Sequence, residues 1–259
     1  MINYLPRIIV DDLLFKEKEN TFKGGICICN FSNWSHYHEV INYLHPKEKE
    51  YYDRLNIDNR KKSYLIGRYA AKRAISFFTG ENNYESILIQ WGIFNQPVVI
   101  NKNLHNIQTS ITHSGNYGAA VVFPESLPIG IDIEKIDPRK NFLLEKQITS
   151  NEGELINSFL YPHDTKLTIL WTVKEALSKV IKSGLTATLD IFEVNKIELK
   201  QNYVVNYFTH FYQYCAISFE LDDRYICSIT YPKNVELFIN IASLQEHFCR
   251  LLRSEEISL

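Results

Sequence analysis

The sequence has few cysteines and no long hydrophobic run. Its five cysteines form no C-x-x-C pair, and Cys27 and Cys29 lie in an apolar run, Ile26–Cys29, where small buried side chains are commoner than zinc ligands. No stretch approaches the roughly 18 apolar residues of a membrane-spanning helix, and Met1–Asp12 lacks the basic and apolar regions of a signal peptide. These absences argue against a disulfide scaffold or a membrane protein and predict a reduced, cytoplasmic protein.

A strong net charge is also missing. The chain carries 28 Lys and Arg against 30 Asp and Glu, a formal net charge of −2. This balance excludes binding to nucleic acid or to a membrane through a large net positive charge. Any bound anion therefore needs a local basic patch. With 259 residues, of which 45% are hydrophobic and 22% charged, the chain can fold without disulfides or metal, as one large domain or two small ones.

Hydrophobic periodicity and turn residues predict a mixture of helices and strands, with no internal repeat evident by eye. The expected helices are about 58–79, 150–160 and 164–181, followed by an amphipathic helix at the end of the chain. The expected strands are Ile26–Phe31, Ile87–Trp91, Pro97–Ile100, Ile107–Ile111, Ala119–Phe123, Ile129–Glu134, Ile191–Leu199, Tyr203–Thr209, Cys215–Leu221 and Tyr225–Tyr231. Each half thus contains a helix followed by strands. This order predicts an α+β fold of two similar subdomains, residues 1–125 and 126–259, divided near Pro124–Pro128.

Two carboxylates alternate with isoleucines in the segment Gly130–Glu134. On a strand, Ile131 and Ile133 point to one face while Asp132 and Glu134 point to the other. Carboxylates that share a face repel each other unless a cation lies between them, and hard divalent cations prefer oxygen ligands. The segment therefore predicts either a cation site or a solvent-facing strand with two ordinary acids.

The expected helix near residue 170 contains the run W-T-V-K-E-A-L-S-K, from Trp171 to Lys179. Its apolar residues gather on one face, whereas Glu175 and Lys179 lie together on the other at a spacing of i and i+4. The pair is either part of a functional site or an exposed ion pair that contributes roughly 0.2–0.5 kcal/mol.

The segment Arg60–Arg73 contains six basic residues and no acid. As a helix, it would place Lys61, Arg68 and Lys72 opposite a buried apolar stripe. Uncompensated cations in a protein of nearly neutral charge favour the docking of one or a few phosphates, although a solvated helix face would have the same pattern.

A single histidine, His113, lies in the segment Ser110–Gly115 among side chains that carry hydroxyl groups. We expect a turn here because glycine ends the segment. His113 is then either a donor to a phosphate group or a turn residue without a function.

Together, Gly130–Glu134 and Trp171–Lys179 resemble the paired signature of the surfactin-type (Sfp-like) 4′-phosphopantetheinyl transferases, with Trp171 and Ala176 typical of the W/KEA subclass. Leu65–Lys72 resembles the first helix motif of that family, Gln96–Pro97 its G-K-P turn, and Ile111–Gly115 its I-S-H-S-G element. These matches run in order from about residue 45 to 195. Asn95 replaces the glycine of the turn, but asparagine also adopts the left-handed conformation; Thr112 replaces serine and keeps its hydroxyl.

The resemblance implies a role for individual residues. Asp132, Glu134 and Glu175 match the acids that hold Mg²⁺ on the pyrophosphate of coenzyme A, and Glu175 is also a candidate base. Lys179 matches the lysine at the phosphate under attack. The remaining matches concern coenzyme A binding: Thr112 and His113 near its phosphates, Arg60, Arg68 and Lys72 near its 3′-phosphate, and Gln96 and Pro97 around the adenine.

The expected reaction moves the 4′-phosphopantetheine arm of coenzyme A onto a serine of an apo carrier protein and releases 3′,5′-ADP, which is a holo-[acyl-carrier-protein] synthase activity. Carriers of fatty acid, polyketide and nonribosomal peptide synthesis all fit, and we expect them to dock near the seam and Phe142–Phe159. The family fold implies a pseudo-twofold pair of subdomains with the site between them, and so a monomer. Two alternatives remain: a catalytically silent coenzyme A-binding scaffold, and a metal-dependent phosphohydrolase.

Overall fold

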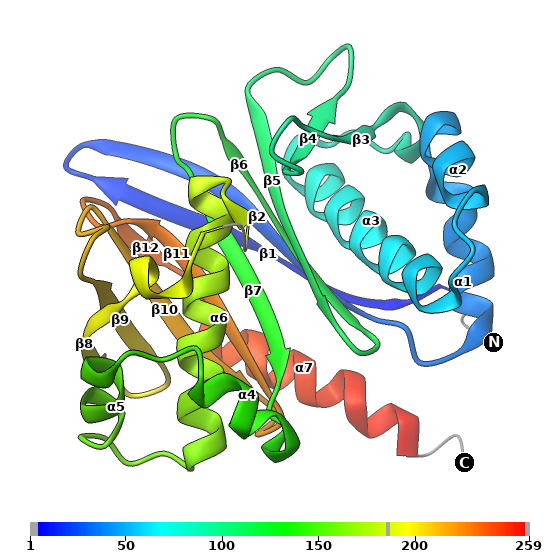
Figure 1. Cartoon of the computed structure of the whole chain (residues 1–259). Coiled ribbons are helices and arrows are strands. Elements are labelled where there is room, and N and C mark those ends of the chain that lie inside the picture. The colour runs from blue at the N-terminus through cyan, green and yellow to red at the C-terminus, as the bar shows by residue number, and fades with distance from the viewer. Residues whose placement is uncertain (1–4, 185–186, 257–259) are drawn as a thin grey trace.

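The computed structural model describes residues 5–184 and 187–256, and its strands form two antiparallel sheets (Figure 1). The seven-stranded sheet has the order β12 (Glu236–Phe238), β1 (Arg7–Glu17), β2 (Asn20–Asn30), β6 (Tyr117–Pro124), β5 (Ile107–Ser114), β4 (Pro97–Ile100), β3 (Leu88–Trp91). The five-stranded sheet has the order β7 (Gly130–Lys135), β11 (Tyr225–Pro232), β10 (Tyr214–Leu221), β9 (Val204–Phe208), β8 (Val194–Leu199).

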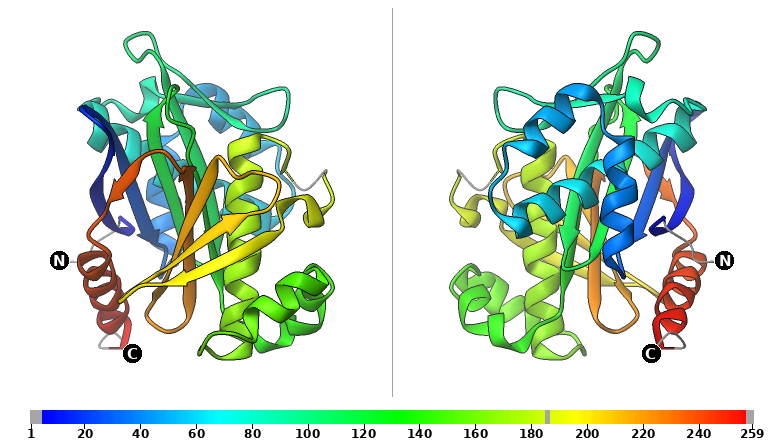
Figure 2. Two further views of the ribbon diagram at one scale, coloured as in Figure 1. Left: turned by 90° about the vertical axis from the view of Figure 1, so that its left-hand side faces the viewer. Right: turned by 90° about the vertical axis from the view of Figure 1, so that its right-hand side faces the viewer.

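Helices cover these sheets. Helix α3 packs on the seven-stranded sheet and α6 on the five-stranded sheet. Helix α7 lies beside β1 and β10, at the opposite side of the molecule from α6 (Figure 2). The α-helices are α1 (Trp34–Val40), α2 (Pro46–Asp53), α3 (Asp58–Thr79), α4 (Asn141–Glu145), α5 (Ser150–Ile156), α6 (His163–Ile181) and α7 (Ile241–Glu256); the short 3₁₀ helices are Ile41–Tyr43, Tyr84–Ser86, Pro138–Lys140 and Leu189–Phe192. The fold is therefore α+β, as the sequence predicts. Within the described residues, no helix is long and apolar enough to cross a membrane.

The two halves repeat one topology, although no internal repeat is evident by eye in the sequence. In the first half, β2 is followed by α1–α3 and β3–β6, and the spatial order is β2-β6-β5-β4-β3. In the second half, β7 is followed by α4–α6 and β8–β11, and the spatial order is β7-β11-β10-β9-β8. Identity between the repeats is confined to a few positions, because burial and backbone geometry constrain them while side chains on the other positions vary.

A buried ion pair marks the repeat most clearly. In the first half, the Lys72 ammonium lies 2.7 Å from the carboxylate of Glu48, which also accepts hydrogen bonds from the backbone N–H groups of His45 and Ile89. In the second half, Lys174 lies 2.6 Å from Glu152. Glu152 accepts from the N–H groups of Thr149 and Val194 in the same way. Each glutamate thus caps a helix, joins it to an edge strand and neutralises a lysine.

Three apolar clusters fill the interior. One lies between the two halves and includes Ile131, Ile133 and Phe248, while the other two lie beneath α3 and α6. Most predicted elements are present, and α3 and β4 have the expected bounds. Two expectations were wrong in detail. Strand β1 was not predicted, because Asp11 and Asp12 interrupt its apolar pattern. His113 lies within β5 and not in a turn, since that strand continues to Ser114.

Candidate active site

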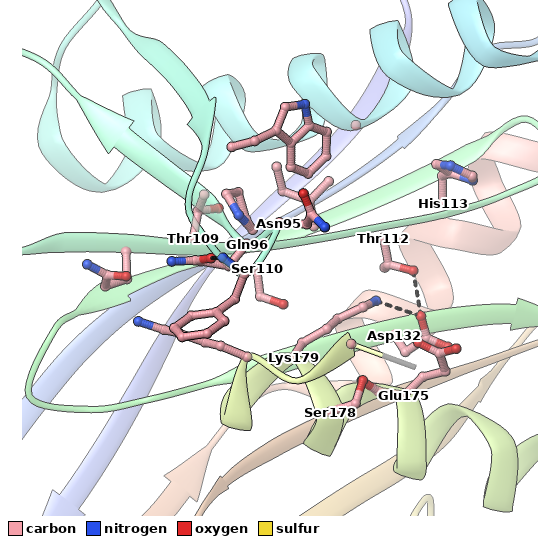
Figure 3. Close-up of a pocket in the computed structure, with 18 of the residues that line it drawn as sticks. Asn95, Gln96, Thr109, Ser110, Thr112, His113, Asp132, Glu175, Ser178 and Lys179 are labelled. Atoms are coloured by element: carbon pink, nitrogen blue, oxygen red, sulfur yellow. Dashed lines mark hydrogen bonds and ion pairs between the residues drawn. The ribbon is translucent and has the colours of Figure 1, made fainter. Parts of the chain in front are cut away.

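A cavity of about 780 Å³ lies where the two halves meet. Helix α3, the β3–β4 turn and β5 supply one side, and β7 and α6 supply the other (Figure 3). All the expected site residues except Lys72 line this cavity: Arg60, Arg68, Gln96, Pro97, Thr112, His113, Asp132, Glu134, Glu175 and Lys179. Residues that lie more than 100 positions apart in the chain are thus brought to one surface.

Close packing of α6 against β7 positions the acidic residues. A Cβ atom on Gly130 would lie only 2.0 Å from the backbone oxygen of Ala176. Because glycine has no Cβ, the helix approaches the strand closely enough for Glu175 and Lys179 to reach Asp132. The glycine of the strand motif and the alanine of the helix motif are therefore contact residues, which is a packing reason for their presence.

The carboxylate of Asp132 is held by one oxygen and free at the other. Its Oδ1 accepts hydrogen bonds from Thr112 Oγ1 at 2.7 Å and from Lys179 Nζ at 2.8 Å, both drawn in Figure 3. Lys179 also donates to the carbonyl oxygen of Ile131, at 2.8 Å. The Oδ2 atom is buried and has no hydrogen-bond partner among the described residues. A buried carboxylate oxygen without a partner is costly, so a ligand that binds it would stabilise the site.

The three carboxylates repel one another across the cavity. Burial, followed by the charge of Asp132 and then that of Glu134, raises the pKa of Glu175 to about 7, although the Lys179 ammonium acts in the opposite direction. Glu134 is more accessible and accepts hydrogen bonds from Ser114 at 3.1 Å and Lys140 at 3.2 Å. Burial and the neighbouring carboxylates together therefore disfavour the ionised form of Glu175.

These acids fit a hard divalent cation by their chemistry. Carboxylate oxygens are the ligands that Mg²⁺ prefers, Asp132 Oδ2 has no hydrogen-bond partner among the described residues, and burial together with the charge of Asp132 raises the pKa of Glu175. Within residues 5–184 and 187–256, however, no three His, Cys, Asp or Glu side chains already converge as a metal-ligand set. Binding of a metal ion would therefore require the carboxylates to move closer together, because the described residues form no preformed coordination site.

Lys179 and His113 both border the acids. Lys179 forms its ion pair with Asp132 across the helix–strand contact, so it is not half of an exposed pair with Glu175. Desolvation of its imidazole by the surrounding cavity wall, followed by the charge of the Lys179 ammonium, lowers the pKa of His113. Part of the side chain is still exposed to solvent. A neutral histidine at neutral pH can still donate one hydrogen bond to a phosphate oxygen.

The β3–β4 turn forms the part of the cavity that was expected to hold adenine. Asn95 has a φ of 59°, so the asparagine does adopt the left-handed conformation expected where the family has glycine. Gln96 folds back on the turn, since its side-chain oxygen accepts from the N–H of Phe94 at 2.9 Å. This turn is a rigid wall of the cavity, from which Pro97 begins β4.

Lys72 does not contact the cavity, and the expectation that it reads a phosphate is wrong. Its ammonium is fully buried and donates to the carbonyl oxygens of Tyr84 and Ile87, besides pairing with Glu48. The basic segment lacks acids of its own, but Glu48 of α2 supplies the compensating charge. Because Glu48 lies on the preceding helix, the sequence of α3 by itself could not show this pair.

Arg68 is also less free than its position on an amphipathic helix predicts. Its side chain is 4% exposed and its Nε lies 3.4 Å from Glu48 Oε1. The guanidinium is sandwiched between the rings of Tyr64, at 4.6 Å, and Trp91, at 4.9 Å. Arg68 still borders the cavity, where it is a fixed part of the wall.

Two features of the site were not predicted. Lys182 at the end of α6 is exposed and lines the cavity, and the only sequence signal was its place one turn after Lys179. The hydroxyl groups of Ser110, Thr112 and Ser114 accept hydrogen bonds from the backbone N–H groups of Ile131, Ile133 and Lys135, at 3.2, 3.3 and 3.1 Å. Their alternation on one face of β5 was visible in the sequence, but not the strand that they would meet.

Fold and site together define an α+β protein with a cavity between two similar halves, lined by acidic and basic side chains. A sequence profile described as the 4′-phosphopantetheinyl transferase superfamily matches residues 128–230. The 4′-phosphopantetheinyl transferase ffp of Bacillus subtilis is 32% identical over 93 residues, which cover 36% of this chain and 41% of that protein. The holo-[acyl-carrier-protein] synthase of Acholeplasma laidlawii (strain PG-8A) is 30% identical over 89 residues, or 32% of this chain and 75% of that protein. The chain therefore belongs to the 4′-phosphopantetheinyl transferase superfamily, although its match spans less than half of the Bacillus relative.

Proposed function

We propose that the protein transfers the 4′-phosphopantetheine arm of coenzyme A to a serine of a carrier protein and releases 3′,5′-ADP. The observation that carries the proposal is the meeting of Asp132, Glu175 and Lys179 in the cavity between the halves. Membership of the superfamily supports the same activity, as do the names of the two relatives.

In this reaction, the serine oxygen attacks the phosphorus that bears the pantetheine arm, and the bond from that phosphorus to the oxygen of 3′,5′-ADP breaks. Glu175 accepts the serine proton, directly or through water. In the protein without metal, its pKa of about 7 makes it a stronger base than an ordinary glutamate that is still partly ionised at neutral pH. Lys179 and His113 stabilise charge on the phosphate oxygens and hold them in line for attack.

Asp132, Glu134 and Glu175 would hold Mg²⁺. When bound, the ion would supply neutralisation of the pyrophosphate charge. Asp132 offers its unpartnered Oδ2, while Thr112 and Lys179 keep the other oxygen in place. Gln96 and Pro97 would bound the adenine, and Arg60 would meet the 3′-phosphate.

We propose α4 as the dock of the carrier protein, in line with the expected segment Phe142–Phe159. Phe142 is 65% exposed and Leu143 is 62% exposed. Lys146 lies over the Phe142 ring, 3.9 Å from its centroid, and Arg139 and Lys140 directly precede α4 in the chain. Lys140 also reaches Glu134 of the acid site. Such a surface complements an acidic amphipathic helix. Phe142→Ala with Leu143→Ala should raise the KM for the carrier and leave the KM for coenzyme A unchanged.

Mass spectrometry of the carrier tests the activity. The protein is incubated with coenzyme A, Mg²⁺ and an apo carrier, and the carrier should gain the mass of one phosphopantetheine arm. Asp132→Ala and Glu175→Ala should each slow the gain by about 10²-fold or more, with the fold intact by circular dichroism. Near-normal turnover of either variant at saturating Mg²⁺ contradicts the assigned roles.

Two controls separate the alternatives. Release of 4′-phosphopantetheine without a carrier indicates a phosphohydrolase, whereas binding of coenzyme A with no product indicates a catalytically silent scaffold. We propose a monomer as the active form, because both halves of one chain line the cavity. Light scattering that finds an obligate trimer would contradict this.

A further inference from the structure

The seam between the halves, where β5 meets β7, is closed by side-chain hydroxyl groups. Ser110, Thr112 and Ser114 alternate along β5, and each accepts a hydrogen bond from a backbone N–H of β7. All three residues are buried, with exposed fractions of 5, 6 and 8%. These three side chains, the seam hydroxyls, therefore replace the backbone pairing that β5 does not make with β7.

Two of the seam hydroxyls make a second bond that the third does not. Thr112 donates to Asp132 Oδ1 at 2.7 Å, and Ser114 donates to Glu134 Oε2 at 3.1 Å. The hydroxyl of Ser110 contacts no acid through any hydrogen bond of the described residues. A hydroxyl has one proton to donate, so the protons of Thr112 and Ser114 are committed to these carboxylates.

The geometry points to Thr112 and Ser114 as positioning residues for Asp132 and Glu134, and this inference rests on the proposed function. With Oδ1 of Asp132 held by Thr112 and Lys179, only Oδ2 remains to bind a ligand. Thr112 acts through this carboxylate, and because it also lines the cavity, its expected contact with coenzyme A stays a prediction beside this role. Because the bonds cross the seam, the same residues join the halves and orient the acids.

Binding of Mg²⁺ to the coenzyme A complex tests the inference by titration calorimetry, without a carrier protein. Thr112→Val, which keeps the shape and removes the hydroxyl, should weaken Mg²⁺ binding by about 10-fold or more, the usual effect of losing a partner of a metal ligand. Ser114→Ala should act in the same direction, and Thr112→Ser should restore the affinity. Ser110→Ala is the matched control, because it removes a seam hydrogen bond without touching an acid.

Thermal unfolding of the metal-free proteins separates positioning from stability. Ser110→Ala and Ser114→Ala should lower Tm by similar amounts, yet only Ser114→Ala should weaken Mg²⁺ binding. Unchanged Mg²⁺ affinity in Thr112→Val overturns the inference, as does an equal loss in Ser110→Ala. Wild-type protein that binds no Mg²⁺ with coenzyme A also overturns it. If the expected pattern is found but the wild type modifies no carrier, the positioning role holds and the proposed function fails.

Discussion

Arg73 of α3 occupies in the first half the position that Glu175 of α6 occupies in the second. Each directly follows a buried lysine, Lys72 or Lys174, that pairs with a helix-capping glutamate. The strands agree with this equivalence, because Gly25–Cys29 reads G-I-C-I-C where the acid strand reads G-I-D-I-E. In the first half, cysteines and an arginine thus replace the three acids.

One acid site per chain follows from this replacement. Cys27 and Cys29 are fully buried, and burial raises the pKa of Cys27 to about 12, so neither thiol offers a thiolate ligand. We expect titration calorimetry to find one coenzyme A bound per chain in the presence of Mg²⁺. Two equivalent binding events would contradict the assignment of the first repeat as non-functional.

Replacement of the buried lysines should affect stability and not substrate binding. Lys72→Met leaves the buried Glu48 without its nearer cation and with only the Arg68 guanidinium at 3.4 Å, which should lower the free energy of unfolding by up to about 3–5 kcal/mol in denaturant titrations. Addition of Glu48→Gln should recover part of this loss, and Lys49→Met on the exposed face of α2 is the control. A stable Lys72→Met protein with a raised KM for coenzyme A would restore the phosphate-binding role.

Stability without metal should depend on pH through Glu175. Its pKa is raised from 4.5 to about 7, so the folded state binds a proton more tightly than the unfolded state, and stability falls as pH rises through this window. In a chelating buffer, Glu175→Gln should be more stable than wild type by about 1–3 kcal/mol at pH 8, with little difference near pH 4.5. Glu154→Gln removes an exposed carboxylate and controls for net charge. An equal advantage at both pH values would show that Glu175 is not destabilised by its charge.

We expect the 3′-phosphate of coenzyme A, which is remote from the reacting phosphorus, to bind two cations that form no ion pair within the described residues. Arg60 and Lys182 line the cavity from α3 and from the end of α6. Arg60→Ala with Lys182→Ala should raise the KM for coenzyme A about 10-fold or more with kcat nearly unchanged, because a remote contact is felt equally in ground and transition states. Lys179→Ala should instead lower kcat.

Dephospho-coenzyme A, which lacks the 3′-phosphate, is the control substrate for this pair. Wild type should use it less well than coenzyme A, and the Arg60 and Lys182 double variant should discriminate little between the two. Lys102→Ala, an exposed lysine outside the cavity, should behave as wild type. Undiminished discrimination by the double variant would show that the 3′-phosphate is bound elsewhere.

Several features of this protein follow from its sequence alone. Local patterns determine the bounds of α3 and β4, since strong periodicity and turn residues act within a few positions. Alternation on a strand and the i, i+4 spacing made Asp132, Glu134, Glu175 and Lys179 candidates, because these patterns define which side chains share a face, and the family resemblance then implied their roles.

Only the tertiary structure decided what these residues contact. The sequence predicts a free cation at Lys72, but Glu48 of another helix neutralises it. The sequence places Thr112 beside the phosphates of the ligand, and only the fold shows that its hydroxyl also bonds Asp132 of β7. Lys179 could have paired with Glu175 on its own helix, yet the absent Cβ of Gly130 lets it reach Asp132. The physical reason is common to all three: a charge or hydroxyl group takes its role from partners distant in sequence, which burial brings within hydrogen-bond distance and which no local pattern encodes.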